Sequence, residues 1–157
     1  MIEGYDDSRH RDDVVALWRA VFRYDAPHNA PELVIDRKLA TGDGLFFVAC
    51  SDAGVVGTIL AGYDGHRGWL YSVAVDAQHR HARIGSALVR HAEQALIALG
   101  CVKINLQIVA GNRQVTDFYR SLGYAVEERI SMGRVVPQNI TGARTSALAE
   151  PPPATTE

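Results

Sequence analysis

The most constraining feature of this sequence lies in residues 73–88, where an apolar strand-like run passes through a short basic turn directly into an apolar helix-like run. The first turn of a helix has backbone N–H groups without intrahelical partners and carries partial positive charge, so it binds phosphate groups well. Arg80 and Arg83 add full charges, and Gly85 has no Cβ to keep a ligand away from the backbone. The segment therefore predicts an anion site.

Two common nucleotide-binding motifs do not fit this turn. A Walker loop needs a glycine-rich stretch that ends in Gly-Lys-Ser/Thr, whereas the nearby Gly85-Ser86 has no lysine between its two residues. The dinucleotide fingerprint needs three glycines at fixed spacing, and this turn has one. What remains is the pattern Arg80-x-x-Arg83-x-Gly85 between an expected strand and an expected helix.

This pattern resembles the Arg/Gln-x-x-Gly-x-Gly/Ala signature of the GNAT superfamily of acetyl-CoA-dependent N-acetyltransferases. Arg83 stands where that family usually has glycine, but the family uses the main-chain N–H at this position, which arginine also has. A second block, from Asn112 to Tyr124, resembles the family's Asn-x-x-Ala-x-x-x-Tyr-x-x-x-Gly-Phe/Tyr block, with Val115 in place of alanine. The two blocks follow in the expected order, with a strand-like run between them.

The resemblance implies that acetyl-CoA is the cosubstrate. Its binding residues would be Val73, Ala74, Val75, Arg80, His81, Ala82, Arg83, Ile84, Gly85, Ser86, Asn112 and Tyr119. In the resembled family the tyrosine at the position of Tyr119 points at the CoA sulfur, so Tyr119 would be the catalytic proton donor to the departing thiolate. A backbone N–H between Val73 and Val75 would stabilise the oxyanion that forms during attack.

The sequence does not single out a general base. A lysine-like amine has a pKa about three units above neutral pH, so it must lose a proton before it attacks a thioester. Several members of the resembled family use a glutamate where this chain has Gln107, which cannot take up a proton. The alternatives are Asp25, Asp64, His66 or a chain of ordered water, and the same three residues are the candidates for binding the acceptor. Asp64 also has a purely structural interpretation, because Asp-Gly is a common hairpin turn.

Hydrophobic periodicity and turn residues predict one α/β domain of the α+β type, with a mixed central sheet of about six to seven strands and helices on both faces. The expected elements are a strand at 2–5, a helix after the possible caps Asp7 and Ser8, a helix from Pro31 to Gly42, a hairpin of 45–50 and 55–63, a central strand at 69–75, a helix from Ile84 to the cap at Gly100, a strand at 102–108, a helix that begins at Asn112, and short strands to about Val136. Residues 1–136 are expected to form the GNAT domain, and the Pro-rich residues 137–157 a disordered tail.

Helical spacing also predicts which side chains are buried. The first helix has an apolar face, made of Val14, Leu17, Trp18, Val21 and Phe22. The helix after the basic turn has a second apolar stripe, made of Ile84, Leu88, Ala92, Ala95 and Leu99.

Composition excludes several classes of protein. A net charge of −2 and a pI of about 6.3 argue against a nucleic-acid-binding protein. Cys50 and Cys101 form no CxxC pair and have no spaced histidine partners, so we expect neither a metal site nor a disulfide framework. The sequence shows no leader and no apolar run long enough to span a bilayer, which predicts a cytoplasmic protein without a membrane partner.

The predicted function is transfer of an acetyl group from acetyl-CoA to a primary amine by direct attack on the thioester. Residues 62–68, 35–38 and 131–133 are similar to the small bacterial YpeA-like group of the family, which implies a stand-alone bacterial enzyme and leaves a homodimer open. Gln107 and Arg83 motivate an alternative, a non-catalytic acyl-CoA sensor or degenerate family member. A third and weaker alternative is an interaction module that docks through its Pro-rich end.

Overall fold

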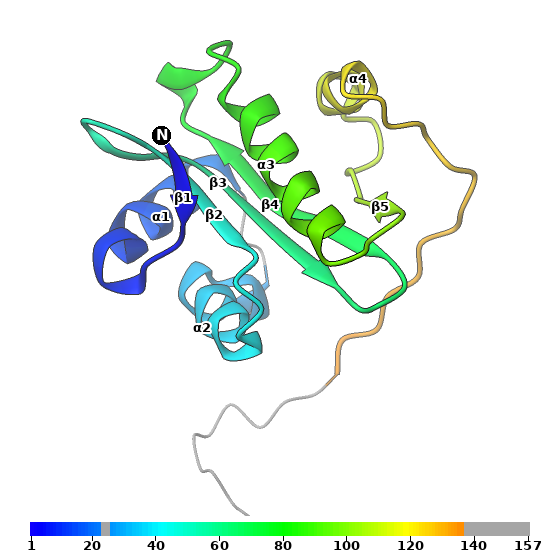
Figure 1. Ribbon diagram of the computed structural model, residues 1–157, viewed down its shortest axis with the longest axis horizontal. Helices are drawn as coiled ribbons and strands as arrows, with labels where there is room; N and C mark the ends of the chain where they lie inside the picture. The colour runs from blue at the N-terminus through cyan, green and yellow to red at the C-terminus, as the bar shows by residue number, and fades with distance from the viewer. Residues whose placement is uncertain (23–25, 137–157) are drawn as a thin grey trace, which may run out of the picture. The chain divides into compact units, whose positions relative to one another are not determined.

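A computed structural model describes residues 1–22 and 26–136 of the chain (Figure 1). The elements are β1 (Ile2–Gly4), α1 (Asp7–Val21), the 3₁₀ helix η1 (Pro27–Asn29), α2 (Pro31–Thr41), β2 (Phe46–Ser51), β3 (Gly54–Tyr63), β4 (Gly68–Val75), the 3₁₀ helix η2 (Ala77–His79), α3 (Ile84–Ala98), β5 (Ile104–Asn105) and α4 (Arg113–Ser121).

The chain divides into two compact units, residues 1–124 and residues 125–157. All the elements named above belong to the first unit. In the described part of the second unit, residues 125–136, the chain forms neither helix nor strand, so the expectation of short strands to Val136 is wrong. The disordered tail expected at 137–157 lies outside the described residues, and the expected end of the domain at residue 136 stays a prediction.

The described strands form one mixed sheet in the order β1-β2-β3-β4-β5. The first four strands are antiparallel, and β5 is parallel to β4. The mixed sheet is confirmed, but it has five strands where about six to seven were expected, and its middle strand is β3 where the 69–75 strand was expected. The strand predicted at 102–108 shrinks to Ile104–Asn105, because its pairing with β4 comprises only two residue pairs. Val102, before this strand, is 92% exposed.

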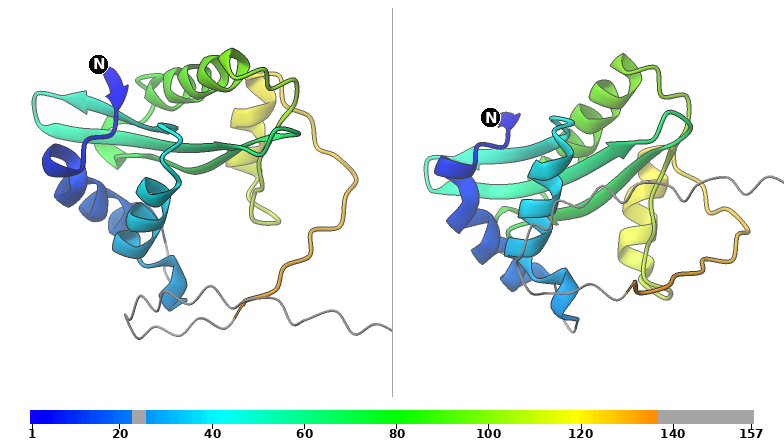
Figure 2. Two further views of the ribbon diagram at one scale, coloured as in Figure 1. Left: turned by 60° about the horizontal axis from the view of Figure 1, so that its bottom comes forward. Right: turned by 90° about the horizontal axis from the view of Figure 1, so that it is seen from below.

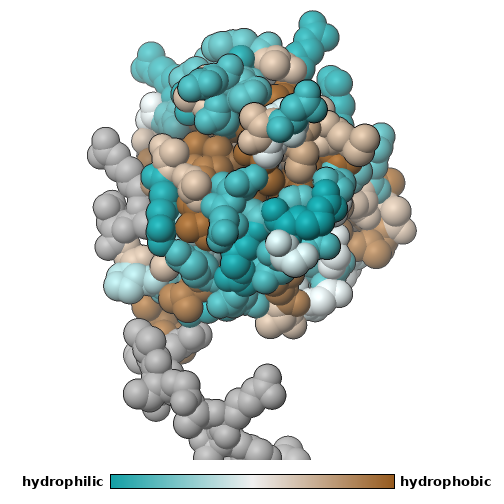
Figure 3. Space-filling view, turned by 90° about the vertical axis from the view of Figure 1, so that its left-hand side faces the viewer, coloured by the Kyte–Doolittle hydropathy of each residue, from teal (hydrophilic) through white to brown (hydrophobic). Residues whose placement is uncertain are grey.

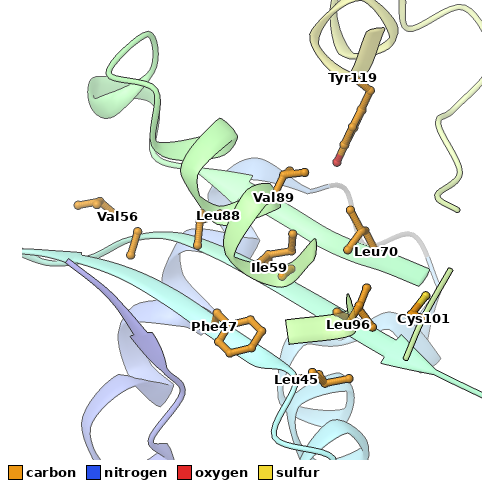
Figure 4. Packing of buried hydrophobic residues seen from close by; sticks show 13 residues of the cluster. Leu45, Phe47, Val56, Ile59, Leu70, Leu88, Val89, Leu96, Cys101 and Tyr119 are labelled. Carbon is orange, nitrogen blue, oxygen red and sulfur yellow. The ribbon is translucent and has the colours of Figure 1, made fainter. Parts of the chain in front are cut away.

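Helices lie on both faces of the sheet, as predicted: α3 on one face, α1 and α2 on the other (Figure 2). The α3-side cluster (Figure 4) consists of buried Leu45, Phe47, Ala49, Val56, Ile59, Ala61, Leu70, Leu88, Val89, Ala92, Leu96, Cys101 and Tyr119. The α1-side cluster consists of buried Val14, Leu17, Trp18, Ile35, Phe46, Val48, Leu60 and Ala74. The face in Figure 3 is ordinary for a folded domain, since hydrophilic side chains cover much of it, with apolar areas between them.

Local signals set the helix ends. The Asp6 side chain caps α1 by accepting the Ser8 N–H at 2.9 Å, so the cap lies one residue before the expected Asp7 or Ser8. Pro31 occupies the first turn of α2, and Gly42 ends that helix at a φ of +62°, both as predicted. None of the helices in residues 1–22 and 26–136 is long and apolar enough to cross a lipid bilayer.

The buried stripe of α3 differs in part from the predicted one. Leu88 and Ala92 are buried as expected, and Leu96 joins them. Leu99 is 54% exposed, because the helix ends at Ala98 and the chain turns away at Gly100, whose φ is +88°. On α1 the predicted face is confirmed, with Val14, Leu17 and Trp18 buried and Val21 and Phe22 half-buried against the same cluster.

Gly57 lets α3 lie close to β3. A Cβ on this residue would lie 2.9 Å from Leu88 Cδ1, 3.1 Å from Ile84 Cγ2 and 3.2 Å from the Ala74 carbonyl oxygen. We expect Gly57→Val to lower the free energy of unfolding by about 1–3 kcal/mol in urea denaturation, because the added atoms overpack this contact. Gly4→Val is the matched control: a Cβ there meets nothing within 4 Å, so the same measurement should change by less than about 0.5 kcal/mol. Equal losses in the two variants would contradict the overpacking argument.

Candidate functional site

Strand β4 contains a bulge at Ser72, whose φ is +46°. The register with β3 shifts here, because Thr58 pairs with Ala74 whereas Leu60 pairs with Tyr71, so β4 holds one extra residue. Regular alternation would place Leu70 and Val73 on opposite faces of the sheet, yet both belong to or pack against the α3-side cluster. The bulge therefore changes which side chains of β4 face each layer.

Beyond the bulge, one edge of β4 has no strand paired with it among the described residues. Its parallel pairing with β5 comprises two residue pairs, Gly68 with Ile104 and Trp69 with Asn105. Among the described strands, the later part of β4 pairs with β3 alone. The other edge of Val73–Val75 therefore has no described neighbouring strand, and an edge of this kind can pair with an extended ligand. These three residues are the strand part of the predicted binding site, and the side chain of Ala74 itself packs into the α1-side cluster.

The basic turn leads from β4 into α3 without a side-chain cap. Arg83 is the N-cap residue of α3, its side chain makes no capping hydrogen bond, and the first turn of the helix holds no acidic residue. The backbone N–H groups at Ile84, Gly85 and Ser86 thus lie at a helix start that favours an anion. Arg80 and Arg83 are exposed beside it, as are His81 and Ala82.

Asp76 holds the turn at its other end. Its carboxylate accepts the Gln78 N–H and contacts the His79 ring, both at 2.9 Å. The hydrogen bond with His79 is the main reason that the pKa of Asp76 lies below its ordinary value. The first part of the turn is therefore fixed by a side chain.

Positive φ angles gather on this stretch of chain. Within residues 1–22 and 26–136, the residues other than glycine with positive φ are Ser72, His81 and Arg83, at 46°, 66° and 60°. Each such residue costs of order 1–3 kcal/mol, and backbone strain of this kind clusters at functional sites. The distribution supports the location of the site that the sequence predicted.

Arg83 offers a direct measurement of this strain. We expect Arg83→Gly to be more stable to unfolding than Arg83→Ala by about 0.5–1 kcal/mol, because both variants lose the side chain but glycine adopts a φ of +60° without a steric penalty. Urea denaturation of the two variants in parallel checks the difference. Equal stabilities would show that the steric cost of the left-handed conformation here is no larger than the extra conformational entropy that glycine gives the unfolded chain, about 0.5–1 kcal/mol.

Gly85 brings α3 close to α4 and β4. A Cβ on Gly85 would lie 3.3 Å from Phe118 Cζ and 3.6 Å from Val75 Cγ2. The sequence indicated a close approach of a ligand or a strand at this glycine, and the structure adds the aromatic ring of α4. Gly85 thus lies where all three parts of the predicted site come together.

Helix α4 is built as the sequence predicted. Asn112 is its N-cap and accepts the Val115 N–H at 3.2 Å, and Gly123 follows the helix with a φ of +96°. Asn112 is exposed, so the role that the structure gives it is that of a cap.

Tyr119 lies on α4 and belongs to the α3-side cluster, where it is 7% exposed. Figure 4 shows its hydroxyl directed away from α4 toward the layer that holds Val89 and Leu70. Burial raises the pKa of Tyr119 to about 12, so its hydroxyl stays protonated at neutral pH. Edge-to-face contacts with the rings of Phe118 and Tyr124, at centroid distances of 5.0 and 5.5 Å, hold the ring. Tyr119 is thus a buried, protonated hydroxyl on a ring held by its neighbours, and its role as proton donor stays a prediction.

Two of the candidate acceptor residues, Asp64 and His66, lie at the other end of β4, in the turn that precedes it. Oδ1 of Asp64 accepts the N–H groups of His66 and Arg67, both at 2.7 Å, and the bond from Arg67 is the largest cause of its lowered pKa. This is the turn-forming role that Asp-Gly suggested. His66 and Gln107 are exposed, and Asp25 lies outside the described residues. Their roles in acceptor binding or proton removal stay predictions.

A second polar group lies near the N-terminus, where His10 Nε2 is 3.6 Å from Glu3 Oε1 and 4.0 Å from Cys50 Sγ. Such residues bind zinc in other proteins. Here, however, Nδ1 of His10 accepts the Asp6 N–H at 3.0 Å, which places the proton of the neutral ring on Nε2, the atom that would have to bind the metal. Glu3 is already paired with Arg9, and burial raises the pKa of the Cys50 thiol. These donors therefore do not suit a metal ion.

Two buried side chains next to the site were not predicted as part of it. Thr58 and Trp18 are each 0% exposed and are hydrogen-bonded to one another at 2.7 Å. Trp18 was assigned only to the core. The sequence offered one signal for this pair, the hydroxyl of Thr58 within the largely apolar run 55–63. A polar group in a buried strand needs a hydrogen-bond partner, so Thr58 could have been expected to bind another buried group.

Comparisons with known proteins agree with these features. Residues 11–124 match the model of a family described as the acetyltransferase (GNAT) family. The chain is 41% identical over 126 residues to acetyltransferase SG1711 of Sodalis glossinidius, which covers 78% of this chain and 87% of that protein.

Solved structures share the fold at low sequence identity. Aminoglycoside 6'-N-acetyltransferase AAC(6')-IG of Acinetobacter haemolyticus is similar with a TM-score of 0.70 and 17% identity, over 87% of this chain and 99% of that one. AAC(6')-Iy, solved in complex with the bisubstrate analog CoA-S-monomethyl-acetylneamine, is similar with a TM-score of 0.66 and 16% identity, over 87% and 98% of the two chains.

Proposed function

Because the chain belongs to the acetyltransferase (GNAT) family, we propose that it transfers the acetyl group of acetyl-CoA to a primary amine of a small molecule or a protein. The observation that carries the proposal is the meeting of three parts in one cluster: the bulged strand β4, the start of α3 and the protonated Tyr119. An acyl transfer from a thioester needs groups that bind phosphate, stabilise an oxyanion and supply a proton, and each of these parts provides one of them.

Acetyl-CoA would bind with its pyrophosphate on the turn from Arg80 to Ser86 and with its pantetheine along Val73–Val75. The uncapped start of α3 supports the first contact, because its N–H groups have no side-chain partner in the described structure. The unpaired edge of β4 supports the second. The AAC(6')-Iy complex shows that a protein of this fold binds a CoA derivative.

The reaction would proceed by direct attack. The amine nitrogen forms a bond to the thioester carbon, and the carbonyl oxygen becomes an oxyanion that accepts a hydrogen bond from a backbone N–H of the Val73–Val75 stretch. The C–S bond then breaks, and the CoA thiolate takes the Tyr119 proton. The attacking amine loses its own proton to water or to one of Asp25, Asp64 and His66. Cys50 and Cys101 have no covalent role in this scheme.

The test is a screen of amines with acetyl-CoA in which free CoA thiol is detected, together with calorimetric titration of acetyl-CoA alone. Binding with amine-dependent thiol release is the expected result. Binding without thiol release from any amine would instead favour a non-catalytic acyl-CoA sensor, for which Gln107 and Arg83 are the motivating residues. No binding at all would overturn both functions.

A further inference from the structure

A chain of hydrogen bonds connects helix α1 to the bulge of β4. Trp18 Nε1 donates to Thr58 Oγ1 at 2.7 Å, and Thr58 Oγ1 donates to the Ser72 carbonyl oxygen at 3.0 Å. Trp18 and Thr58 are both completely buried. An indole N–H can only donate, so it occupies a lone pair of the hydroxyl and leaves the Thr58 proton for the Ser72 carbonyl.

This contact fixes the direction of the peptide group between Ser72 and Val73. Ser72 and Val73 are skipped in the pairing of β3 with β4, so the regular ladder does not orient this peptide. In a planar trans peptide the N–H points opposite to the carbonyl oxygen. Because the Ser72 carbonyl accepts from the Thr58 hydroxyl, the Val73 N–H points away from that hydroxyl, and the β4 edge that β5 leaves unpaired lies beside this peptide.

We propose that Thr58 is a positioning residue of acetyl transfer: it holds the Ser72–Val73 peptide so that the Val73 N–H faces the acetyl carbonyl oxygen. The inference rests on the proposed function. The left-handed φ of Ser72 is unfavourable for a residue with a side chain, so the bulge needs a partner that holds it. Thr58 supplies that partner from the neighbouring strand.

Thr58→Val keeps the branched shape and removes the hydroxyl. Complete loss of an oxyanion donor lowers kcat by about a hundredfold or more. In Thr58→Val the donor is still present but less well oriented, so kcat should fall by roughly tenfold. We expect that fall in kcat with less than a twofold change in the KM for acetyl-CoA. Thr58→Ser retains the hydroxyl and should restore kcat to within about twofold of the wild type.

Trp18→Phe is the matched control, because it also breaks a buried hydrogen bond but leaves the contact between Thr58 and Ser72 in place. Both Thr58→Val and Trp18→Phe should lower the melting temperature, yet kcat should fall much more in Thr58→Val. Equal losses of kcat in these two variants, or a full kcat in Thr58→Val, would overturn the proposal.

Amide hydrogen exchange of Val73, followed by NMR in the same proteins, tests the inference without turnover. We expect faster exchange at Val73 in Thr58→Val, and wild-type exchange there in Thr58→Ser. Unchanged exchange in Thr58→Val would show that the hydroxyl does not hold this peptide, even if the wild-type protein proves to be an active acetyltransferase. An inactive wild-type protein would count against the proposed function, whatever the exchange at Val73.

Discussion

Tyr119→Phe lowers kcat for acetyl transfer by roughly ten- to a thousandfold and leaves the affinity for acetyl-CoA almost unchanged. The substitution keeps the ring and its contacts with Phe118 and Tyr124, and it removes only the hydroxyl. CoA thiol is already a fair leaving group, so the loss should be partial. Binding of the ground state should hardly change, because the hydroxyl matters mainly as the sulfur takes on negative charge.

The measurement is steady-state kinetics with an acceptor for which chemistry limits the rate, together with calorimetry of acetyl-CoA. Tyr124→Phe is a suitable control, since it also removes a tyrosine hydroxyl, here one that donates to Glu93 Oε1 at 2.8 Å, and it should leave kcat within a few fold of the wild type. An unchanged kcat in Tyr119→Phe would leave Tyr119 with a structural role only, as an aromatic side chain that α4 contributes to the core.

The pH profile of the wild-type enzyme follows from the same residue. With a pKa of about 12, Tyr119 keeps nearly all of its proton up to the pH at which an amine acceptor with a pKa near 10.4 is half deprotonated. The rate should therefore rise with pH through deprotonation of the amine, with no loss from ionisation of Tyr119 in that range. The Tyr119→Phe variant should show the same rise at a lower level.

Gly85→Leu weakens acetyl-CoA binding far more than Arg80→Ala does. Leucine at this position overlaps Phe118 and Val75, so it displaces α4 or the start of α3 and disturbs the backbone N–H groups that would bind the pyrophosphate. We expect a hundredfold or greater rise in Kd, about 2.7 kcal/mol. Arg80→Ala removes one exposed charge, worth about 1 kcal/mol, and should raise Kd by less than about tenfold.

Calorimetric titration of acetyl-CoA into the two variants compares their Kd values. Circular dichroism serves as the control for whether both variants are folded. Gly85→Ala adds only the Cβ, at 3.3 Å from Phe118, so its Kd for acetyl-CoA should lie between those of the other two variants. The opposite ranking would mean that side-chain charge, not the helix start, carries the site.

Signals that act within a few residues were predicted well from the sequence. Asn112, Pro31 and Gly42 each define a helix end through their own backbone or side-chain chemistry, and all three do so in the structure. The order of elements up to α4 follows from the same kind of local pattern. Two parts of the candidate site, β4 and the start of α3, were likewise expected, because they follow one another directly in residues 73–88. The third part, Tyr119, was expected from the separate block at residues 112–124.

Features that depend on distant partners were not predictable in this way. Leu99 fits the helical stripe of α3, but its exposure depends on where the helix ends. The alternation over 102–108 suits a strand, yet a strand needs a neighbour, and β4 supplies only two residue pairs. The bulge at Ser72 accepts a hydrogen bond from Thr58 on another strand, so no pattern within β4 predicts it.

The early separation of β4 from β5 has a consequence for the lifetime of the protein. An unpaired strand edge is a template on which other extended chains can add, and it is a recognised starting point for aggregation. If acetyl-CoA lies along Val73–Val75, its pantetheine arm fills this edge as a strand would. Its binding also stabilises the native state by mass action, by about 2.7 kcal/mol at a hundredfold excess over Kd. The supply of cosubstrate in the cell would then govern how long the protein persists, as well as how fast it works.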